Sequence, residues 1–405
     1  MVKALRRFVL AMSLVMVAAC TTSPAMYQPA TTQLKSGSAS DFDQYLAETR
    51  EHLSENLEPV PDFPRDQQIE WNMPFRNTPA AHCEPEQTRG ILLVHGLSDS
   101  PFVFRDFARV LADQCVEVRT VLLQGHGTRP GDLVTTDADI WRAQVREHFD
   151  ALAEDVDIPF IGGFSLGGAL ATERALAADS AKPAGLVVLA PAWELNGLKD
   201  YLWLASTARL FRDFVEEEPE LNPVKYESFA TNSAVQLSDV LDNVQDLLSQ
   251  YREIDLPVLV AATEADSVIN LEFLVTQFRT RFTNPDNRML VFRDLRKPWP
   301  KAWQDDRIVS YNSYLPDNNI LEFSHQSLAI APDNELYGLG KPLQRCLEPN
   351  LISLEDCRQL TEKDLWFSAW HDTEKPVLTS RLTYNPWFNE MADALTEFVL
   401  AQEKP

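Results

Sequence analysis

The sequence predicts an α/β fold with a doubly wound, mostly parallel sheet and a helical cap inserted into it. Short, almost wholly apolar runs stop at glycine or polar residues, as strands buried on both faces of a parallel sheet do. Stretches with the period of amphipathic helices separate these runs, and strands that alternate with helices imply right-handed crossovers. In such sheets, functional groups gather in the loops at the carboxyl ends of the strands.

The pattern is clearest from residue 90 onward, where the predicted elements follow one another regularly. We assign residues 88–405 to one α/β domain and residues 41–87 to an N-terminal extension. The predicted strands are 91–94, 116–123, a run that ends at Gly162, 185–191, 258–262 and 289–292. The predicted helices are 41–58, 102–112, 137–154 and 386–401.

Two segments do not fit the repeating unit. Residues 192–255 separate two predicted strands by more than one helix needs, and they begin with an aromatic, apolar section. We interpret them as a helical cap over the mouth of the sheet, with a purely structural insertion as the alternative. Residues 326–384 form a second insertion, to which the sequence assigns no role.

Composition excludes one class of partner. Of the 405 residues, 45% are hydrophobic, which is enough for a large core. The formal net charge is -24, and such a field repels phosphate backbones, so we exclude nucleic acid as a partner. The cysteine and histidine spacing is not that of a metal site, and no cofactor is predicted.

The first twenty residues predict export. Residues 1–19 combine a basic start with an apolar run that is too short to span a bilayer, as in a signal peptide. The small residues at 17–19 before Cys20 resemble the lipobox of bacterial lipoproteins. That resemblance implies a lipid anchor on Cys20 and a place in the cell envelope, at the outer membrane facing the periplasm; a secretory signal with a chance cysteine is the alternative. Residues 20–40, rich in Thr, Ser, Pro and Ala, are expected to form a flexible tether.

The other four cysteines form an even set. In an oxidising compartment they permit two disulfides, with three possible connectivities. We favour Cys83–Cys115 and Cys346–Cys357 because the members of each pair are near in sequence, and four buried free thiols are the alternative.

The motif Gly163-x-Ser165-x-Gly167 lies between a predicted strand and an Ala-rich helix. It needs glycine two residues to either side because the turn is so tight that other side chains would collide with the neighbouring strand and helix. The turn lifts the Ser165 hydroxyl out of the sheet and places it at a helix N-terminus, where a developing negative charge is favoured. The motif therefore predicts a nucleophile.

A serine hydroxyl needs a base, and that base needs a carboxylate. Asp266, just after a predicted strand, is the predicted carboxylate, and Glu264 is the nearby alternative. His325 is the predicted base because it follows an apolar stretch, and His371 is the alternative. His148 falls within a helical pattern, where we expect a solvated side chain.

Two backbone amides complete the predicted site. Acyl transfer is helped by N–H donors that are fixed in place before the oxyanion forms. Leu166, directly after the serine, would supply one donor. Leu97, in the loop 95–101 after the first apolar strand, would supply the other.

These motifs together resemble those of α/β-hydrolase esterases. His-Gly-Leu-Ser-Asp-Ser-Pro at 95–101, Gln-Gly-His-Gly at 124–127, the serine motif at 163–167 and then an acid and a histidine occur in the order of that family. Over residues 88–330 the chain looks most like bacterial carboxylesterases, monoacylglycerol lipases and lysophospholipases. A compact member would place its histidine just after the strand at 289–292, so here a long excursion must bring the base back.

The resemblance implies a triad of Ser165, His325 and Asp266, with an oxyanion hole at Leu97 and Leu166. It implies hydrolysis of a small-molecule ester or lipid, such as an acyl-glycerol or a lysophospholipid, through an acyl-enzyme. A serine peptidase or amidase on the same fold is one alternative. A catalytically inactive envelope scaffold is another.

Overall fold

The structure is a computed structural model that describes residues 24–34, 39–83, 86–178, 181–197, 207–209, 211–347, 349, 351–361, 364–369 and 377–403. Cys20, the predicted signal peptide and the alternative base His371 lie outside the described residues. Within the described ranges, every helix is too short or too polar to cross a membrane.

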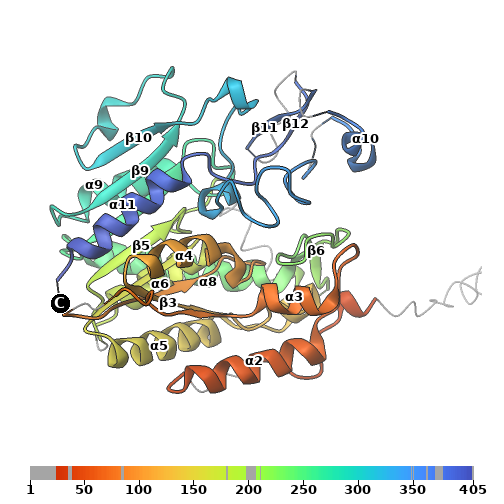
Figure 1. Ribbon diagram of the computed structural model, residues 1–405, viewed down its shortest axis with the longest axis horizontal. Coiled ribbons are helices and arrows are strands. Elements are labelled where there is room, and N and C mark those ends of the chain that lie inside the picture. The colour runs from red at the N-terminus through yellow and green to blue at the C-terminus, as the bar shows by residue number, and fades with distance from the viewer. Residues whose placement is uncertain are drawn as a thin grey trace, which may run out of the picture.

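An eight-stranded sheet forms the centre of the molecule (Figure 1). Its strands lie in the order β1-β3-β2-β4-β5-β8-β9-β10, and all neighbours are parallel except β1, which runs antiparallel to β3. The predicted mostly parallel α/β sheet is therefore confirmed. The strands of this sheet are β1 (Arg76–Asn77), β2 (Arg89–Val94), β3 (Val116–Val121), β4 (Ile158–Phe164), β5 (Gly185–Leu189), β8 (Val258–Thr263), β9 (Arg288–Arg293) and β10 (Ile308–Asn312).

The helices pack in groups against this sheet. Helices α4 and α11 contact each other, and the ring centroids of Phe107 and Phe388 lie 4.6 Å apart between them. Helices α5, α6 and α8 form another group in mutual contact. The α-helices are α2 (Phe42–Asn56), α3 (Arg65–Asn72), α4 (Arg105–Asp113), α5 (Ala138–Asp155), α6 (Leu166–Leu176), α8 (Thr231–Gln250), α9 (Leu271–Thr280), α10 (Leu354–Arg358) and α11 (Phe388–Ala401).

The register of the central strands brings their carboxyl ends to one edge. Val94 of β2 pairs with Gly163 of β4, and Thr263 of β8 pairs with Phe292 of β9. All residues of β4, β5 and β8 are buried, which fits their apolar sequences. The loops that follow β2, β4 and β8 therefore leave the sheet side by side.

The beginning of the described chain corrects one expectation. We expected residues 20–40 to be a flexible tether, but the described part packs on the domain. Ala30 N donates a hydrogen bond to Asp132 Oδ1 (2.6 Å), and Leu34 is buried in an apolar cluster with Leu53. The ring of Tyr27 also packs against Phe214, with centroids 5.4 Å apart. The composition is misleading here because a few separate contacts hold the segment, with no apolar period to reveal them.

The extension also covers α5. Helix α2 lies along α5 (Figure 1), and the rings of Tyr45 and His148 lie 4.3 Å apart. The His148 side chain is buried, so the expectation that it is solvated is wrong. The periodicity of α5 alone could not show this, because the covering helix comes from a distant part of the sequence.

The predicted cap segment at 192–255 contains two different structures. Helix α8 packs with α5 and α6 as one of the helices on the sheet, and it buries Val240, Leu241 and Val244. Before α8, the described residues include a short hairpin of β6 (Phe214–Glu216) and β7 (Phe229–Ala230). Only the residues before Thr231 can therefore form a cap, because α8 packs on the sheet with α5 and α6.

The second insertion, residues 326–384, folds onto the domain beside α4. Asp106 of α4 accepts hydrogen bonds at Oδ2 from Ala331 N (2.9 Å) and Asn334 Nδ2 (2.8 Å). The insertion also contains α10 and the paired strands β11 (Trp366–Ser368) and β12 (Thr379–Arg381). The described residues contain two disulfides: Cys346–Cys357 lies within this insertion, and Cys83–Cys115 joins the end of the extension to the α/β domain.

The extension, the cap and the second insertion meet one another. Asn72 Nδ2 of the extension donates to Pro223 O of the cap (2.7 Å). Asn222 of the cap and Tyr337 of the second insertion are both buried, and the Asn222 side-chain amide lies within hydrogen-bond distance of the Tyr337 hydroxyl through both its nitrogen and its oxygen (2.8 and 3.0 Å). Beside them is an open pocket of about 500 Å³, lined in part by Phe63, Leu221 and Leu343.

Candidate active site

Ser165 sits in a sharp turn between β4 and α6. Its backbone has φ 54° and ψ -118°, a conformation that is costly for any residue except glycine. A Cβ atom on Gly167 would lie 1.9 Å from Val94 O, and one on Gly163 would lie 2.3 Å from the Gly167 carbonyl carbon. The two glycines therefore allow β2, β4 and α6 to approach closely enough to hold the serine in this turn.

Asp266 and His325 form a hydrogen-bonded pair. His325 Nδ1 lies 2.7 Å from Asp266 Oδ2, and the two side chains are 12% and 2% exposed. The other carboxylate oxygen, Oδ1, accepts from Val268 N (2.8 Å) and Ile269 N (2.9 Å). Because the backbone fixes the carboxylate, Asp266 holds the orientation of the imidazole ring.

The His325 ring lies next to the serine turn. Its centroid is 4.8 Å from that of Phe164, the residue that directly precedes Ser165. The structure thus places the Asp266–His325 pair next to the residue that precedes Ser165. The alternative carboxylate, Glu264, is turned elsewhere, since its Oε2 accepts from Asp294 N (3.1 Å).

An extra strand explains how the chain returns to the site. After β9 the chain forms β10 at the edge of the sheet, which adds a parallel strand before His325. The residues before His325 are then fixed to the central strands. Thr263 Oγ1, at the end of β8, donates to Phe323 O (3.2 Å), and the ring of Phe323 stacks on Phe292 of β9 at 5.4 Å. The sequence does not predict these contacts, because only one threonine and two phenylalanines make them and these residues are far apart in the chain.

The amides of Leu97 and Leu166 follow the ends of β2 and β4, Leu97 in a loop and Leu166 at the start of α6. Leu166 is the first residue of α6, so its N–H belongs to the unpaired first turn of the helix. Among the described residues, the hydrogen bonds of the backbone leave both amides without a protein acceptor. Both amides therefore remain able to donate to a ligand.

Two buried histidines hold the Leu97 loop in place. His126 Nε2 accepts from Ser98 N (3.1 Å), and His95 Nε2 accepts from Leu123 N (3.1 Å). Burial lowers the pKa of His126 to about 4 and that of His95 well below its usual value. Both rings are therefore neutral near pH 7, and each one keeps the lone pair that its backbone donor needs.

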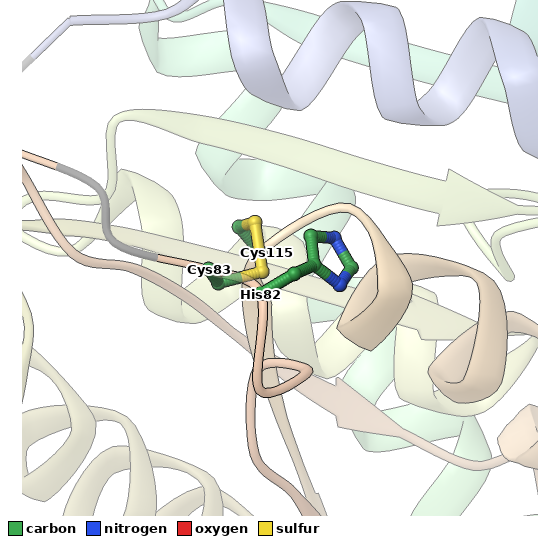
Figure 2. A group of neighbouring side chains, drawn as sticks. All are labelled: His82, Cys83 and Cys115. Atoms are coloured by element: carbon green, nitrogen blue, oxygen red, sulfur yellow. A yellow bond between two sulfur atoms is a disulfide. The ribbon is translucent and has the colours of Figure 1, made fainter.

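One cluster outside the serine site combines a histidine with two cysteines, which are residue types that often bind metals. His82, Cys83 and Cys115 lie together on the surface near the start of β3 (Figure 2). The two sulfur atoms are joined in a disulfide, as Figure 2 shows, so they are not available as thiolate ligands. These residues therefore do not form a metal site in this state.

Comparison with known proteins finds several that this chain resembles in part. The chain is 26% identical over 183 residues to a thermostable monoacylglycerol lipase of Bacillus sp. (strain H-257), over 44% of this chain and 71% of that protein. It is 23% identical over 186 residues to a carboxylesterase of Bacillus subtilis (strain 168), over 45% of this chain and 74% of that protein. Among solved structures, a metagenome-derived lipolytic enzyme matches with a TM-score of 0.47 and 20% identity, over 58% of this chain and 90% of that one.

The family model of the alpha/beta hydrolases matches residues 91–295, just over half of the chain. The matched range contains the serine turn and Asp266, whereas His325 and the second insertion lie beyond it. The chain belongs to the alpha/beta hydrolase family.

Proposed function

We propose that this protein is a serine hydrolase that cleaves carboxylic esters through an acyl-enzyme. The observation that carries the proposal is the Asp266–His325 pair beside the strained serine turn. Because His325 Nδ1 faces the carboxylate, its proton points toward Asp266 and Nε2 keeps a lone pair. That nitrogen is the base that would take the proton of the Ser165 hydroxyl.

The reaction then follows in two halves. Ser165 Oγ attacks the ester carbonyl carbon while His325 accepts the proton, and the Leu97 and Leu166 amides donate to the oxyanion. His325 next gives the proton to the leaving alcohol, and the acyl group stays on Ser165. A water molecule, deprotonated by His325, attacks the acyl-enzyme; His325 then returns that proton to Ser165 Oγ as the acid leaves.

Similarity to a monoacylglycerol lipase and a carboxylesterase supports an ester as the substrate. An acyl-glycerol, a lysophospholipid or a similar small ester is the proposed class. The same constellation cleaves amides on other folds, so the choice between ester and amide needs a direct test.

The decisive experiment measures hydrolysis of p-nitrophenyl esters from acetate to palmitate. The protein without residues 1–20 is compared with Ser165→Ala, His325→Ala and His371→Ala. We expect both Ser165→Ala and His325→Ala to lose activity and His371→Ala to keep it. If no ester is cleaved but Ser165 still reacts with a fluorophosphonate, the ester assignment fails and amides become the substrates to test. If Ser165 is inert to both, an inactive scaffold is the better explanation.

We also propose that Cys20 carries a lipid and anchors the protein in the cell envelope, at the outer membrane facing the periplasm. The basic and apolar sequence before Cys20 supports this. Three residues separate Cys20 from Pro24 in the sequence, and each spans at most ~3.6 Å. An anchored domain would thus stay close to the bilayer and to membrane-derived esters.

The anchor is tested by expressing the full chain and Cys20→Ser in a bacterium with two membranes. We expect the unmodified protein to fractionate with the outer membrane and its N-terminal peptide to carry the mass of a lipid. The Cys20→Ser variant should be released into the soluble fraction. An unmodified cysteine in the mature protein would contradict the proposal.

A further inference from the structure

Ser98, directly after the predicted oxyanion donor Leu97, has an unfavourable backbone conformation. Its φ is 61°, in the left-handed region that a residue with a side chain rarely adopts. Such a conformation persists only where contacts around the residue hold it. The contacts of Ser98 therefore show what fixes the loop that carries the Leu97 amide.

The Leu97 N–H belongs to the same peptide group as the Gly96 carbonyl. Every peptide bond of the described chain is trans, so the N–H and the C=O of this group point in opposite directions. Gly96 O accepts from Asp99 N (3.3 Å) and lies 2.8 Å from His95 Nδ1. Because these contacts fix the carbonyl, they also fix the direction in which the Leu97 N–H points.

The next fixed peptide group connects this loop to the cap. The Asp99 N–H that holds Gly96 O shares its peptide group with the Ser98 carbonyl. Ser98 O in turn accepts from Tyr226 N of the cap (2.8 Å). A single peptide group therefore lies between the cap and the peptide that carries the Leu97 donor.

The side chain of Tyr226 reaches the same loop by a second route. Its hydroxyl donates to Gly125 O (3.2 Å) and accepts from Thr128 N (2.8 Å). Its ring is stacked on the His126 ring, with 8° between the planes and 6.4 Å between the centroids. His126 Nε2 accepts from Ser98 N, so both backbone groups of Ser98 depend on Tyr226, one directly and one through His126.

The cap segment around Tyr226 is itself held firmly. The buried carboxylate of Glu220 accepts from Glu227 N (2.9 Å) and Ser228 N (2.8 Å), directly after Tyr226. The extension donates to Pro223 O on the other side. Tyr226 is therefore a fixed point against which the loop is held.

We propose that Tyr226 is a positioning residue for the oxyanion hole, through which the cap aims the Leu97 amide at the oxyanion. This inference rests on the proposed ester hydrolysis. The oxyanion forms only as the reaction proceeds, so a misplaced Leu97 amide weakens binding of the transition state and not of the ester. Loss of the Tyr226 contacts should thus lower kcat and leave KM nearly unchanged.

The test compares the full-length protein with Tyr226→Phe, which loses only the hydroxyl contacts, and Tyr226→Ala, which also loses the ring. The substrate is p-nitrophenyl butanoate, and the final extent of fluorophosphonate labelling at Ser165 gives the concentration of competent enzyme. Complete loss of one oxyanion donor costs about 10²–10³ in kcat. We expect kcat to fall about tenfold in Tyr226→Phe and about a hundredfold in Tyr226→Ala, with KM within about twofold.

A pair of inhibitors separates positioning from a general distortion of the site. With an alkyl trifluoromethyl ketone, Ser165 Oγ adds to the carbonyl carbon and His325 takes the proton, which leaves an oxyanion like that of the reaction. The methyl ketone with the same alkyl chain binds without this addition. We expect Ki for the trifluoromethyl ketone to rise by the factor by which kcat falls, and Ki for the methyl ketone to stay constant.

Tyr251→Phe is the matched control. The Tyr251 hydroxyl also donates to a backbone carbonyl, Leu176 O (3.0 Å), but at the opposite end of α6 from Ser165. Its loss should leave kcat and both Ki values unchanged.

Three results would overturn the positioning role: an unchanged kcat in both Tyr226 variants, a change confined to KM, or equal weakening of the two ketones. If butanoate hydrolysis in the unmodified protein still depends on Ser165, only this role fails. If the unmodified protein neither cleaves the ester nor binds the trifluoromethyl ketone, the proposed function fails with it.

Discussion

At the scale of single residues, the site depends on backbone contacts that only glycine permits. Ser165 is held at positive φ because Gly167 lets α6 approach the carbonyl of Val94. Gly167→Ala would place a methyl group 1.9 Å from that oxygen, so the turn must open. We expect loss of ester hydrolysis and a lower melting temperature. Gly197→Ala is the control: its φ is +64° but no atom lies near, so only about 1 kcal/mol of stability should be lost.

Two substitutions test whether Asp266 or Glu264 is the carboxylate that acts on His325. Asp266→Asn keeps the shape of the side chain but removes the charge that stabilises the imidazolium and selects its tautomer. We expect kcat to fall about 10⁴-fold. Glu264→Gln should change kcat less than threefold, because Glu264 faces Asp294 N and not His325. Comparable losses in the two variants would contradict the assignment.

At the scale of elements, the Cys346–Cys357 disulfide links two parts of the second insertion that are 11 residues apart in sequence. The Cys83–Cys115 disulfide spans a separation of 32 residues and joins the extension to the α/β domain. Replacing either pair with serines should lower the free energy of unfolding by about 3 kcal/mol, slightly more for the longer loop. Urea unfolding of the two double variants measures this. Unchanged unfolding midpoints would show that the insertion and the domain are held by packing alone.

At the scale of the whole molecule, buried neutral histidines couple stability to pH. Burial lowers the pKa of His148 to about 4. Between pH 6.5 and about 4 the unfolded chain therefore binds a proton at His148 that the folded protein does not, and stability falls as the pH is lowered through this window. His148→Gln removes the effect. We expect the stability of the variant relative to the unmodified protein to rise by roughly 3 kcal/mol from pH 7 to 4, measured by urea unfolding at each pH. A constant difference would contradict burial of a neutral His148.

Several features were determined by the sequence alone. The apolar runs predicted the strands β2, β5, β8 and β9 within a few residues, because strands buried on both faces must be apolar throughout. The serine motif was also readable, because its glycines serve a local turn. Both features depend on residues that are neighbours in the sequence, so the sequence alone predicts them.

Tertiary structure decided what depends on contacts between distant segments. It placed Asp266 and not Glu264 against His325, through Thr263 and the extra strand β10. It buried His148 under α2 and docked residues 24–34 onto the domain. No local period records such contacts, because each one is made by a few side chains or backbone groups whose partners lie far along the chain.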